Sequence, residues 1–238
     1  MLPWLSGSSA ARFNDVRDTS LSKLVRDDLL TLILTGVLAQ GQRINEPDVA
    51  ARLQVSRVPV REALRELESS GLVVSRKHSG VFVRQLDSTE VRDLYQMRGL
   101  LDGFAGRCAA QLAAVERKAV MVKLLTAVDA MFDAANQGDV QRYYTANLSF
   151  HWTIVEAAGN QQLSDAYRGI VQKLHLSRLK NLSQDLGMLA SIAEHAEIAR
   201  TLGDAEAEHC EALMVRHVDD AYKRLTRTEF FPAPAQCT

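Results

Sequence analysis

The chain has 238 residues, of which 47% are hydrophobic and 24% are charged, and its formal net charge is −1. These values are ordinary for a soluble protein with a packed core, organised as one large domain or two smaller ones. Three widely spaced cysteines exclude a disulfide framework and a CxxC site, which favours a reducing, cytoplasmic location. The sequence contains no run of eighteen apolar residues and no secretory signal pattern, so we expect neither a transmembrane helix nor export.

The first 86 residues carry a small excess of positive charge, twelve Lys and Arg against nine Asp and Glu, whereas the remainder carries sixteen against twenty. A basic N-terminal part followed by an acidic remainder weakly indicates nucleic-acid binding by the N-terminal part. Residues 1–18 lack periodicity and are expected to form a mobile arm. A helix is then predicted through Leu38, with Gly41 as its end signal, followed by a short helix over 46–53.

The stretch from Val55 to Glu68 predicts a helix with two different faces. Ser56 suits the N-cap and Pro59 suits the first turn, where no backbone N–H is needed. One face is apolar at helical spacing: Val60, Ala63, Leu64 and Leu67. The other carries three arginines spaced by four: Arg57, Arg61 and Arg65. Such a face suits phosphates and guanine edges in a major groove, but the commoner use of an arginine stripe alone is a solvated surface paired with acidic residues, here Glu62, Glu66 and Glu68.

Two short strands, 72–75 and 81–84, are predicted after Gly71 stops this helix. Between them lies the basic tip Arg76-Lys77-His78-Ser79-Gly80. A basic hairpin directly after an arginine helix is typical of a winged helix-turn-helix, whose wing reaches phosphates or the minor groove. The order of three helices and a basic hairpin therefore predicts a DNA-binding domain over 19–86.

The segment from Asn45 through Gly80, with Val-Ser-Arg-Val-Pro-Val-Arg-Glu-Ala-Leu and Gly-Leu-Val at its centre, resembles the GntR family of bacterial transcription regulators. The resemblance implies four DNA contacts: Arg57, Arg61, His78 and Gly80. Spacing and position add three more: Ser56, Arg65 and Lys77. The commonest family form has Thr where this chain has Val58, which removes one hydroxyl contact to the DNA backbone.

A domain boundary is predicted near Asp87, with Ser88 as the N-cap of a long helix. From there to about residue 226 the sequence lacks strand signals, and three Gly-containing turns separate helices. The expected helices span 88–113, 116–136, 139–158, 161–182, 188–202 and 204–226. The fold class is therefore mainly α: a winged helix-turn-helix, then an all-helical bundle over 87–228 and a flexible tail over 229–238.

Four polar residues of the bundle form a candidate metal site: Asn147, His151, His195 and His217. Asn147 and His151 are spaced i,i+4 and so share a helix face. Imidazole nitrogens and an oxygen that project inward from facing helices can hold a divalent transition metal. By spacing alone, surface or satisfied core histidines are the commoner outcome, because only two of the four residues are close in sequence.

The segments Asn147-Leu-Ser-Phe-His151, Glu194-His195 and Asp204 through His217 resemble the FCD ligand-binding domain of the FadR subfamily. The resemblance implies that the four candidate residues coordinate a cation such as zinc, nickel or manganese. Many members carry Asp at the position of Asn147, so a hard cation should bind more weakly here.

Arg98, in Tyr95-Gln-Met-Arg98, matches an arginine that faces the ligand cavity in this family. The resemblance implies that its planar fork binds a carboxylate of a small organic acid, with Tyr144 as a further candidate contact. The alternative is an ion pair with Asp102, four residues later on the same helix.

These features predict an effector-responsive transcription regulator, most simply a repressor, and not an enzyme. As a homodimer it would present two winged domains to a pseudo-palindromic operator. Two alternatives stay open. One is a metal-dependent hydrolase fused to a DNA-binding module, for which Glu194 is the one candidate base. The other is a purely structural cation that ties three helices together.

Overall fold

The computed structural model describes residues 2–4, 20–179 and 187–227. The expectations for most of the N-terminal arm, for residues 180–182 and for the C-terminal tail lie outside these ranges. The chain forms two compact units. Among the described residues, the first comprises 20–86 and 175–179, and the second comprises 2–4, 87–174 and 187–227. None of the described helices is long and apolar enough to cross a membrane.

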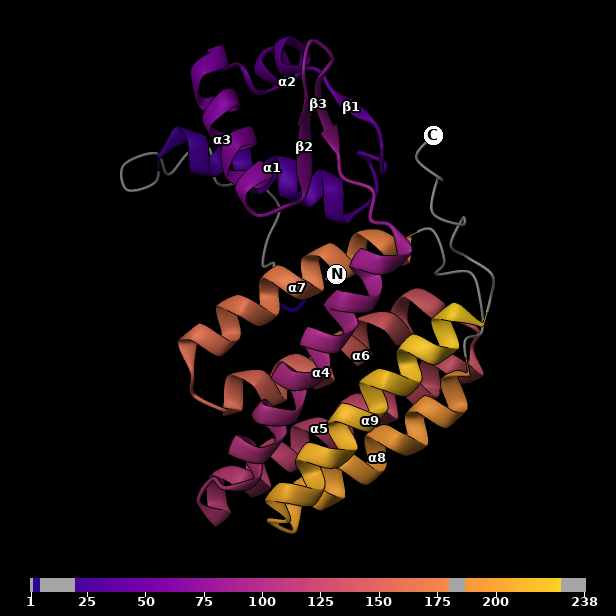
Figure 1. The fold of residues 1–238 in the computed structure, drawn as a ribbon. Helices are drawn as coiled ribbons and strands as arrows, with labels where there is room; N and C mark the ends of the chain where they lie inside the picture. The colour runs from indigo at the N-terminus through magenta and orange to yellow at the C-terminus, as the bar shows by residue number, and fades with distance from the viewer. Residues whose placement is uncertain (1, 5–19, 180–186, 228–238) are drawn as a thin grey trace. The chain divides into compact units, whose positions relative to one another are not determined.

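The first unit has three helices and a small antiparallel sheet (Figure 1). Its elements are α1 (Leu21–Leu34), β1 (Arg43–Ile44), α2 (Glu46–Leu53), α3 (Arg57–Ser69), β2 (Val73–Arg76) and β3 (Gly80–Val83). The strand order is β1-β3-β2, with β3 paired to both neighbours. The apolar faces of α1 and α3 pack together, and the predicted inward residues of α3 are all buried. This is the winged helix-turn-helix that the sequence predicts.

Two local predictions in this unit and at its end were wrong, and a third, the N-cap at Ser56, was right in position only. Helix α1 ends at Leu34 rather than Leu38, because Gly36 adopts a left-handed conformation (φ 77°) directly after the cap residue. Ser56 occupies the N-cap of α3, but its side chain makes no capping hydrogen bond. Asp87, not Ser88, caps the following helix: its carboxylate accepts from the backbone N–H of Glu90, whose side chain accepts from that of Asp87.

The second unit is a helical bundle. Its helices are α4 (Ser88–Ala110), α5 (Ala114–Asn136), α6 (Val140–Ala157), α7 (Gln161–Leu179), α8 (Met188–Gly203) and α9 (Ala207–Thr226). Their described bounds lie within three residues of the predicted ones, because each helix has a long apolar periodicity and three of them, α5, α6 and α8, end at a glycine turn signal. Leu2 and Trp4 also belong to this unit: Leu2 is buried and the Trp4 ring lies 4.8 Å from that of Trp152. The expectation of a mobile arm therefore does not hold for residues 2–4.

Helices α4 and α9 lie side by side and approach closely (Figure 1). A Cβ at Gly103 of α4 would come within 2.7 Å of Val215, and one at Gly106 within 3.0 Å of Met214. Only glycine permits this spacing. The bundle interior between such closely packed helices also holds a group of buried polar residues: Arg98, Asp102, Asn147, His151, His195 and His217.

Candidate metal centre and nucleic-acid interface

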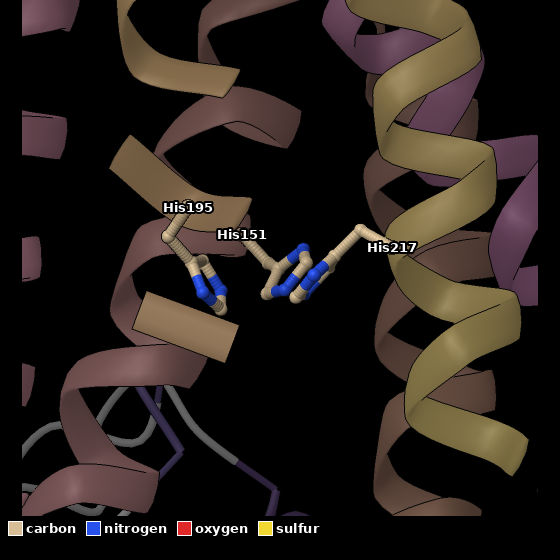
Figure 2. Close-up of side chains that lie close together, drawn as sticks. All are labelled: His151, His195 and His217. Carbon is tan, nitrogen blue, oxygen red and sulfur yellow. The ribbon is translucent and has the colours of Figure 1, made fainter. Parts of the chain in front are cut away.

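Three histidines from three helices converge inside the bundle (Figure 2). His151 lies on α6, His195 on α8 and His217 on α9, and their side chains are 0%, 0% and 3% exposed. One ring nitrogen from each lies within 4.8 Å of the others. The structure thus brings together residues that are separated by up to 66 positions in the sequence.

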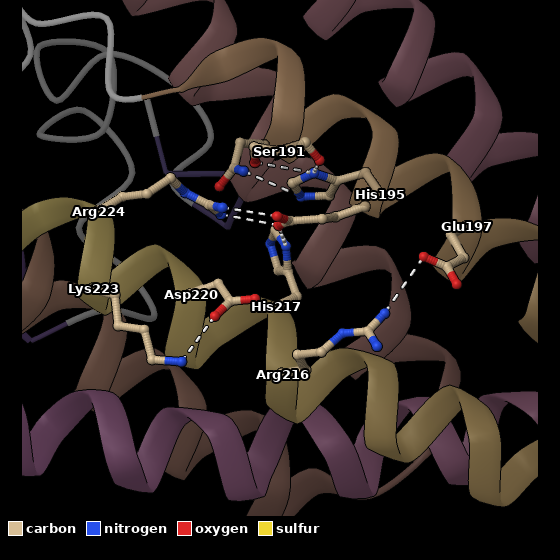
Figure 3. Close-up of polar contacts among 10 residues, drawn as sticks. Ser191, His195, Glu197, Arg216, His217, Asp220, Lys223 and Arg224 are labelled. Carbon is tan, nitrogen blue, oxygen red and sulfur yellow. Dashed lines mark hydrogen bonds and ion pairs between the residues drawn. The ribbon is translucent and has the colours of Figure 1, made fainter.

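An oxygen atom lies within hydrogen-bonding distance of the Nδ1 atom of each imidazole. Nδ1 of His151 lies 3.1 Å from Oδ1 of Asp102, and Nδ1 of His217 lies 2.6 Å from Oε2 of Glu194. Nδ1 of His195 lies 2.6 Å from the backbone oxygen of Ser191, one helical turn earlier (Figure 3). The Nε2 atoms are left facing inward, and Nε2 of His151 is buried with no hydrogen-bond partner in the described chain. A buried nitrogen of this kind fits the role of a metal ligand.

Asn147 reaches the same place from one turn before His151. Its amide nitrogen lies 3.2 Å from Nε2 of His195. As an amide N–H can only donate, this contact uses the lone pair of His195 that a metal would take. Asn147 would therefore act as a ligand through its oxygen, with the amide turned around.

Burial keeps the three histidines neutral. It lowers the pKa of His151 to about 4, and it also lowers the pKa values of His195 and His217. A neutral imidazole has a free lone pair, so the cluster is ready to coordinate a cation at neutral pH. Imidazole suits zinc and nickel, and the donor set fits the ions implied by the family resemblance.

Both carboxylates behind the histidines are also bound to arginines. Nε of Arg98 lies 3.0 Å from Oδ2 of Asp102, and the two terminal nitrogens of Arg224 lie 2.7 Å and 2.9 Å from the oxygens of Glu194. Burial opposes ionisation of Glu194, but hydrogen bonds from His217 and Arg224 outweigh it and lower its pKa to about 2. The network therefore contains two carboxylates, two guanidinium groups and three neutral rings, and it carries no net charge.

Arg98 makes the ion pair that the sequence offered as the alternative to effector binding. The pair engages one nitrogen of the guanidinium, Nε. Tyr95, Tyr144 and Tyr167 lie close enough to influence the ionisation of Arg98. The buried hydroxyl of Tyr167 lies beside both Arg98 and Asp102, so this ion pair is surrounded by polar groups.

The arginine stripe of α3 faces solvent, and within the described residues it forms no ion pair with any of its three expected acidic partners. Glu66 accepts from Arg26 instead, and Glu68 accepts from the backbone and side chain of Ser75. Arg61 does pair, through Nε and at 2.8 Å, with Glu46 of α2. Arg57 and Arg65 make no ion pair or hydrogen bond within the described residues. Their free guanidinium groups suit a phosphate backbone better than a self-contained protein surface.

The hairpin between β2 and β3 holds its basic tip by backbone conformation. His78 and Gly80 adopt positive φ angles of 60° and 99°, and Lys77 and His78 are exposed. A Cβ at position 80 would lie 3.1 Å from Nε of Arg43, so Gly80 leaves space for that guanidinium. The Arg76 guanidinium lies 4.5 Å from the centre of the Phe82 ring.

Several residues of these sites were assigned no binding role from the sequence. Arg43 lies on β1, a two-residue strand that is too short to show any periodicity. Val58 is 63% exposed beside the arginine stripe, where an apolar group can contact a thymine methyl. No feature of the sequence pointed to the hydroxyl of Tyr167. The position of Val58 on the polar side of its helix, in contrast, follows from the helical wheel.

Comparisons with known proteins agree with this architecture. Residues 21–83 match the model of the bacterial regulatory proteins of the gntR family, and residues 93–220 match the FCD domain. The chain is 32% identical over 200 residues to a protein of Paenarthrobacter nicotinovorans named "Probable D-xylose utilization operon transcriptional repressor", which covers 84% of this chain and 86% of that protein. It is 29% identical over 187 residues to the "Nta operon transcriptional regulator" of Aminobacter aminovorans, covering 78% and 85%.

Solved structures show the same fold. A GntR-type putative transcriptional regulator from Rhodococcus sp. RHA1 matches with a TM-score of 0.71 at 23% identity, over 88% of this chain and 99% of that one. E. coli McbR/YncC matches with a TM-score of 0.70 at 19% identity, over 89% and 99%. The chain therefore belongs to the GntR family of bacterial regulatory proteins with a C-terminal FCD domain, and it is a DNA-binding transcription regulator rather than an enzyme.

Proposed function

We propose that this regulator represses transcription as a homodimer until a small organic acid binds in the bundle together with a divalent cation. One observation supports this most strongly: three neutral, buried imidazoles bring a ring nitrogen each within 4.8 Å of one another, and Nε2 of His151 has no partner among the described residues. An apolar interior would not keep such a cluster without a ligand to satisfy it.

The cation would be held by His151, His195 and His217, with the amide oxygen of Asn147 as a further ligand. Zinc, nickel and manganese are the candidate ions. The ion would supply a positive centre for one oxygen of an acidic effector. Because the surrounding network is already neutral, the added positive charge favours an anionic ligand over a neutral one.

Arg98 is proposed to hold another oxygen of the same acid. Its pair with Asp102 fixes the guanidinium plane through Nε. The planar fork of a guanidinium can bind a carboxylate through two N–H groups. Tyr144 is proposed as a further contact, since it is buried near this arginine.

The DNA side of the proposal assigns contacts to the winged domain. Ser56, whose hydroxyl is not used as a helix cap, is proposed to bind a phosphate at the start of α3. The other proposed contacts are Arg57, Arg61, Arg65, Lys77, His78 and Gly80. A homodimer would present two winged domains to an operator with two-fold symmetry. The protein would then act in the cytoplasm, where the bacterial DNA lies. The name of the relative from Paenarthrobacter nicotinovorans, an operon repressor, supports repression as the simplest mode.

A thermal-shift screen tests this proposal. The purified protein is melted with a panel of small mono- and dicarboxylates, after chelation and after reloading with zinc, nickel or manganese. A ligand that binds only the folded state raises the melting temperature. At a concentration a hundredfold above its Kd, it adds about 2.7 kcal/mol to the free energy of unfolding. We expect one class of acid to raise it only in the metal-loaded protein.

The variant Arg98→Lys keeps the charge beside Asp102 but removes the planar fork, so it should lose this acid response. Arg216→Lys is the matched control, because Arg216 lies on the surface of α9 and pairs with Glu197 at 3.5 Å. A metal-dependent rise with no response to any acid would instead support the second candidate, a structural cation. That candidate is favoured by the origin of the three histidines on three separate helices.

A further inference from the structure

We propose that Asp102 and Glu194 are positioning residues that fix the proton of His151 and of His217 on Nδ1, so that both rings present an unprotonated Nε2 to the metal. The inference rests on the proposed metal centre and adds two residues that do not touch the ion. It assigns to each carboxylate a role beyond pairing with an arginine.

Asp102 has two partners, Arg98 and His151. The side chain is fully buried, with Oδ2 at 3.0 Å from Nε of Arg98 and Oδ1 at 3.1 Å from Nδ1 of His151. A guanidinium is always charged and can only donate, so Asp102 is held as an ionised acceptor. The neutral ring of His151 must then donate from Nδ1, which leaves the lone pair on Nε2.

Glu194 repeats this arrangement on the other side of the cluster. Arg224 donates to both of its oxygens, and Oε2 lies 2.6 Å from Nδ1 of His217 (Figure 3). His195 reaches the same outcome differently, since the backbone carbonyl of Ser191 at its Nδ1 can only accept. All three rings are therefore held in the tautomer with the proton on Nδ1, because each Nδ1 faces an oxygen that can only accept a hydrogen bond.

The opposite tautomer would place an N–H at the point where the cation binds. Acceptors behind metal-binding histidines commonly contribute 10- to 100-fold in metal affinity because they orient the ring and fix its proton. The paired arginines have a second effect: they cancel the charges of the two carboxylates without competing for the metal. The chain thus provides a neutral three-nitrogen donor set in a buried place.

The variant Asp102→Asn should move the proton of the His151 ring from Nδ1 to Nε2, while the new side chain keeps nearly the shape of the old one. Because Arg98 can only donate, the amide oxygen must face Arg98 and the amide nitrogen must face His151. Nδ1 of His151 then has to accept, and the proton moves to Nε2. We expect the zinc affinity to fall by about 10- to 100-fold, as for other lost acceptors of this type.

Glu194→Gln should have a smaller effect on His217. The Glu194 side chain is 23% exposed, so water can satisfy part of the altered network. The matched control is Glu197→Gln, the same substitution one turn later on α8, where the carboxylate is 48% exposed and pairs with Arg216 at the surface. It should leave both the tautomers and the zinc affinity unchanged.

The test is a long-range ¹H–¹⁵N spectrum of the histidine rings in metal-free, acid-free protein at pH 7, with zinc affinity measured in parallel by competition with a chromophoric chelator. We expect Nδ1–H forms for His151, His195 and His217 in the wild type, and an Nε2–H form for His151 in Asp102→Asn alone. A wild-type His151 protonated on Nε2, or an unchanged tautomer in a folded Asp102→Asn, would overturn the inference.

The spectrum separates this inference from the proposed function, because it needs neither metal nor effector. If Asp102→Asn does not fold, as judged by circular dichroism, the wild-type spectrum decides the question by itself. Wild-type rings in the expected tautomer together with no zinc affinity would support the positioning role and refute the metal centre.

Discussion

The two units of this protein use charged side chains in opposite ways. On the winged domain the Arg61 side chain is 59% exposed, and its neighbours Arg57 and Arg65 have no partner in the described chain. In the bundle the Arg98 side chain is 5% exposed and Asp102 is fully buried, and each has a fixed partner. The first arrangement suits a long polyanion that is met in water, and the second suits a small ligand that must fit a prearranged site.

This difference determines what a substitution should do in each unit. Exposed arginines contribute little to folding, since surface pairs are worth at most about 1 kcal/mol. Removing one member of the buried network instead leaves a charge without a partner, which costs about 3–5 kcal/mol. Function and stability should therefore separate cleanly on the winged domain and remain linked in the bundle.

The largest effect is expected from charge reversal on α3. The double variant Arg57→Glu and Arg61→Glu removes two contacts to bases or phosphates, each worth about 1–3 kcal/mol, and adds repulsion. The Kd for an operator selected from random duplex DNA should rise by at least about 100-fold, measured by fluorescence anisotropy, with an unchanged melting temperature. Arg92→Glu is the control, because Arg92 is equally exposed on α4 but pairs only with its neighbour Asp93. Unaltered operator binding by the double variant would refute the recognition-helix assignment.

A smaller effect is expected when the metal-free bundle is acidified. The pKa of His151 is about 4 in the folded protein against 6.5 for an ordinary histidine, and the pKa values of the other two are lowered as well. Between these values the unfolded chain binds protons that the folded chain does not, so the free energy of unfolding falls as the pH drops from 6.5 to about 4. His151 alone should account for roughly 3 kcal/mol.

Urea unfolding in the presence of a chelator, at pH 7 and at pH 4.5, measures this loss. His209→Gln should show the same loss as the wild type, since His209 is exposed and lies outside the cluster. A free energy of unfolding that stays constant over this range would mean that the three histidines are not buried in neutral form.

The elements of the fold were predictable where the periodicity is long. The bundle helices run for sixteen to twenty-three residues each, so their apolar faces and turn glycines define them well. The errors arose where one or two residues decide the outcome. Gly36 ends α1 earlier than expected, and β1 exists only because β3 pairs with it.

The candidate sites divide in the same way. The i,i+4 spacing of Arg98 and Asp102 allowed their ion pair to be anticipated, because it lies within one helix. The contact between Asp102 and His151 joins helices whose residues are 49 positions apart, and no local pattern encodes it. The likeness to a known family grouped the histidines, but their outer carboxylates required the packed structure.

The most direct test of the account is the Kd for the selected operator with and without the acid identified by the thermal-shift screen, in zinc-loaded protein. Coupling between two sites of one protein is typically 1–3 kcal/mol, so the acid should change the Kd by about 5- to 150-fold. The change should appear in the wild type and in Arg216→Lys and be lost in Arg98→Lys, with the same affinity in all three before the acid is added. An acid that binds the bundle and leaves the operator Kd of the wild type unchanged would contradict the claim that this buried site controls DNA binding.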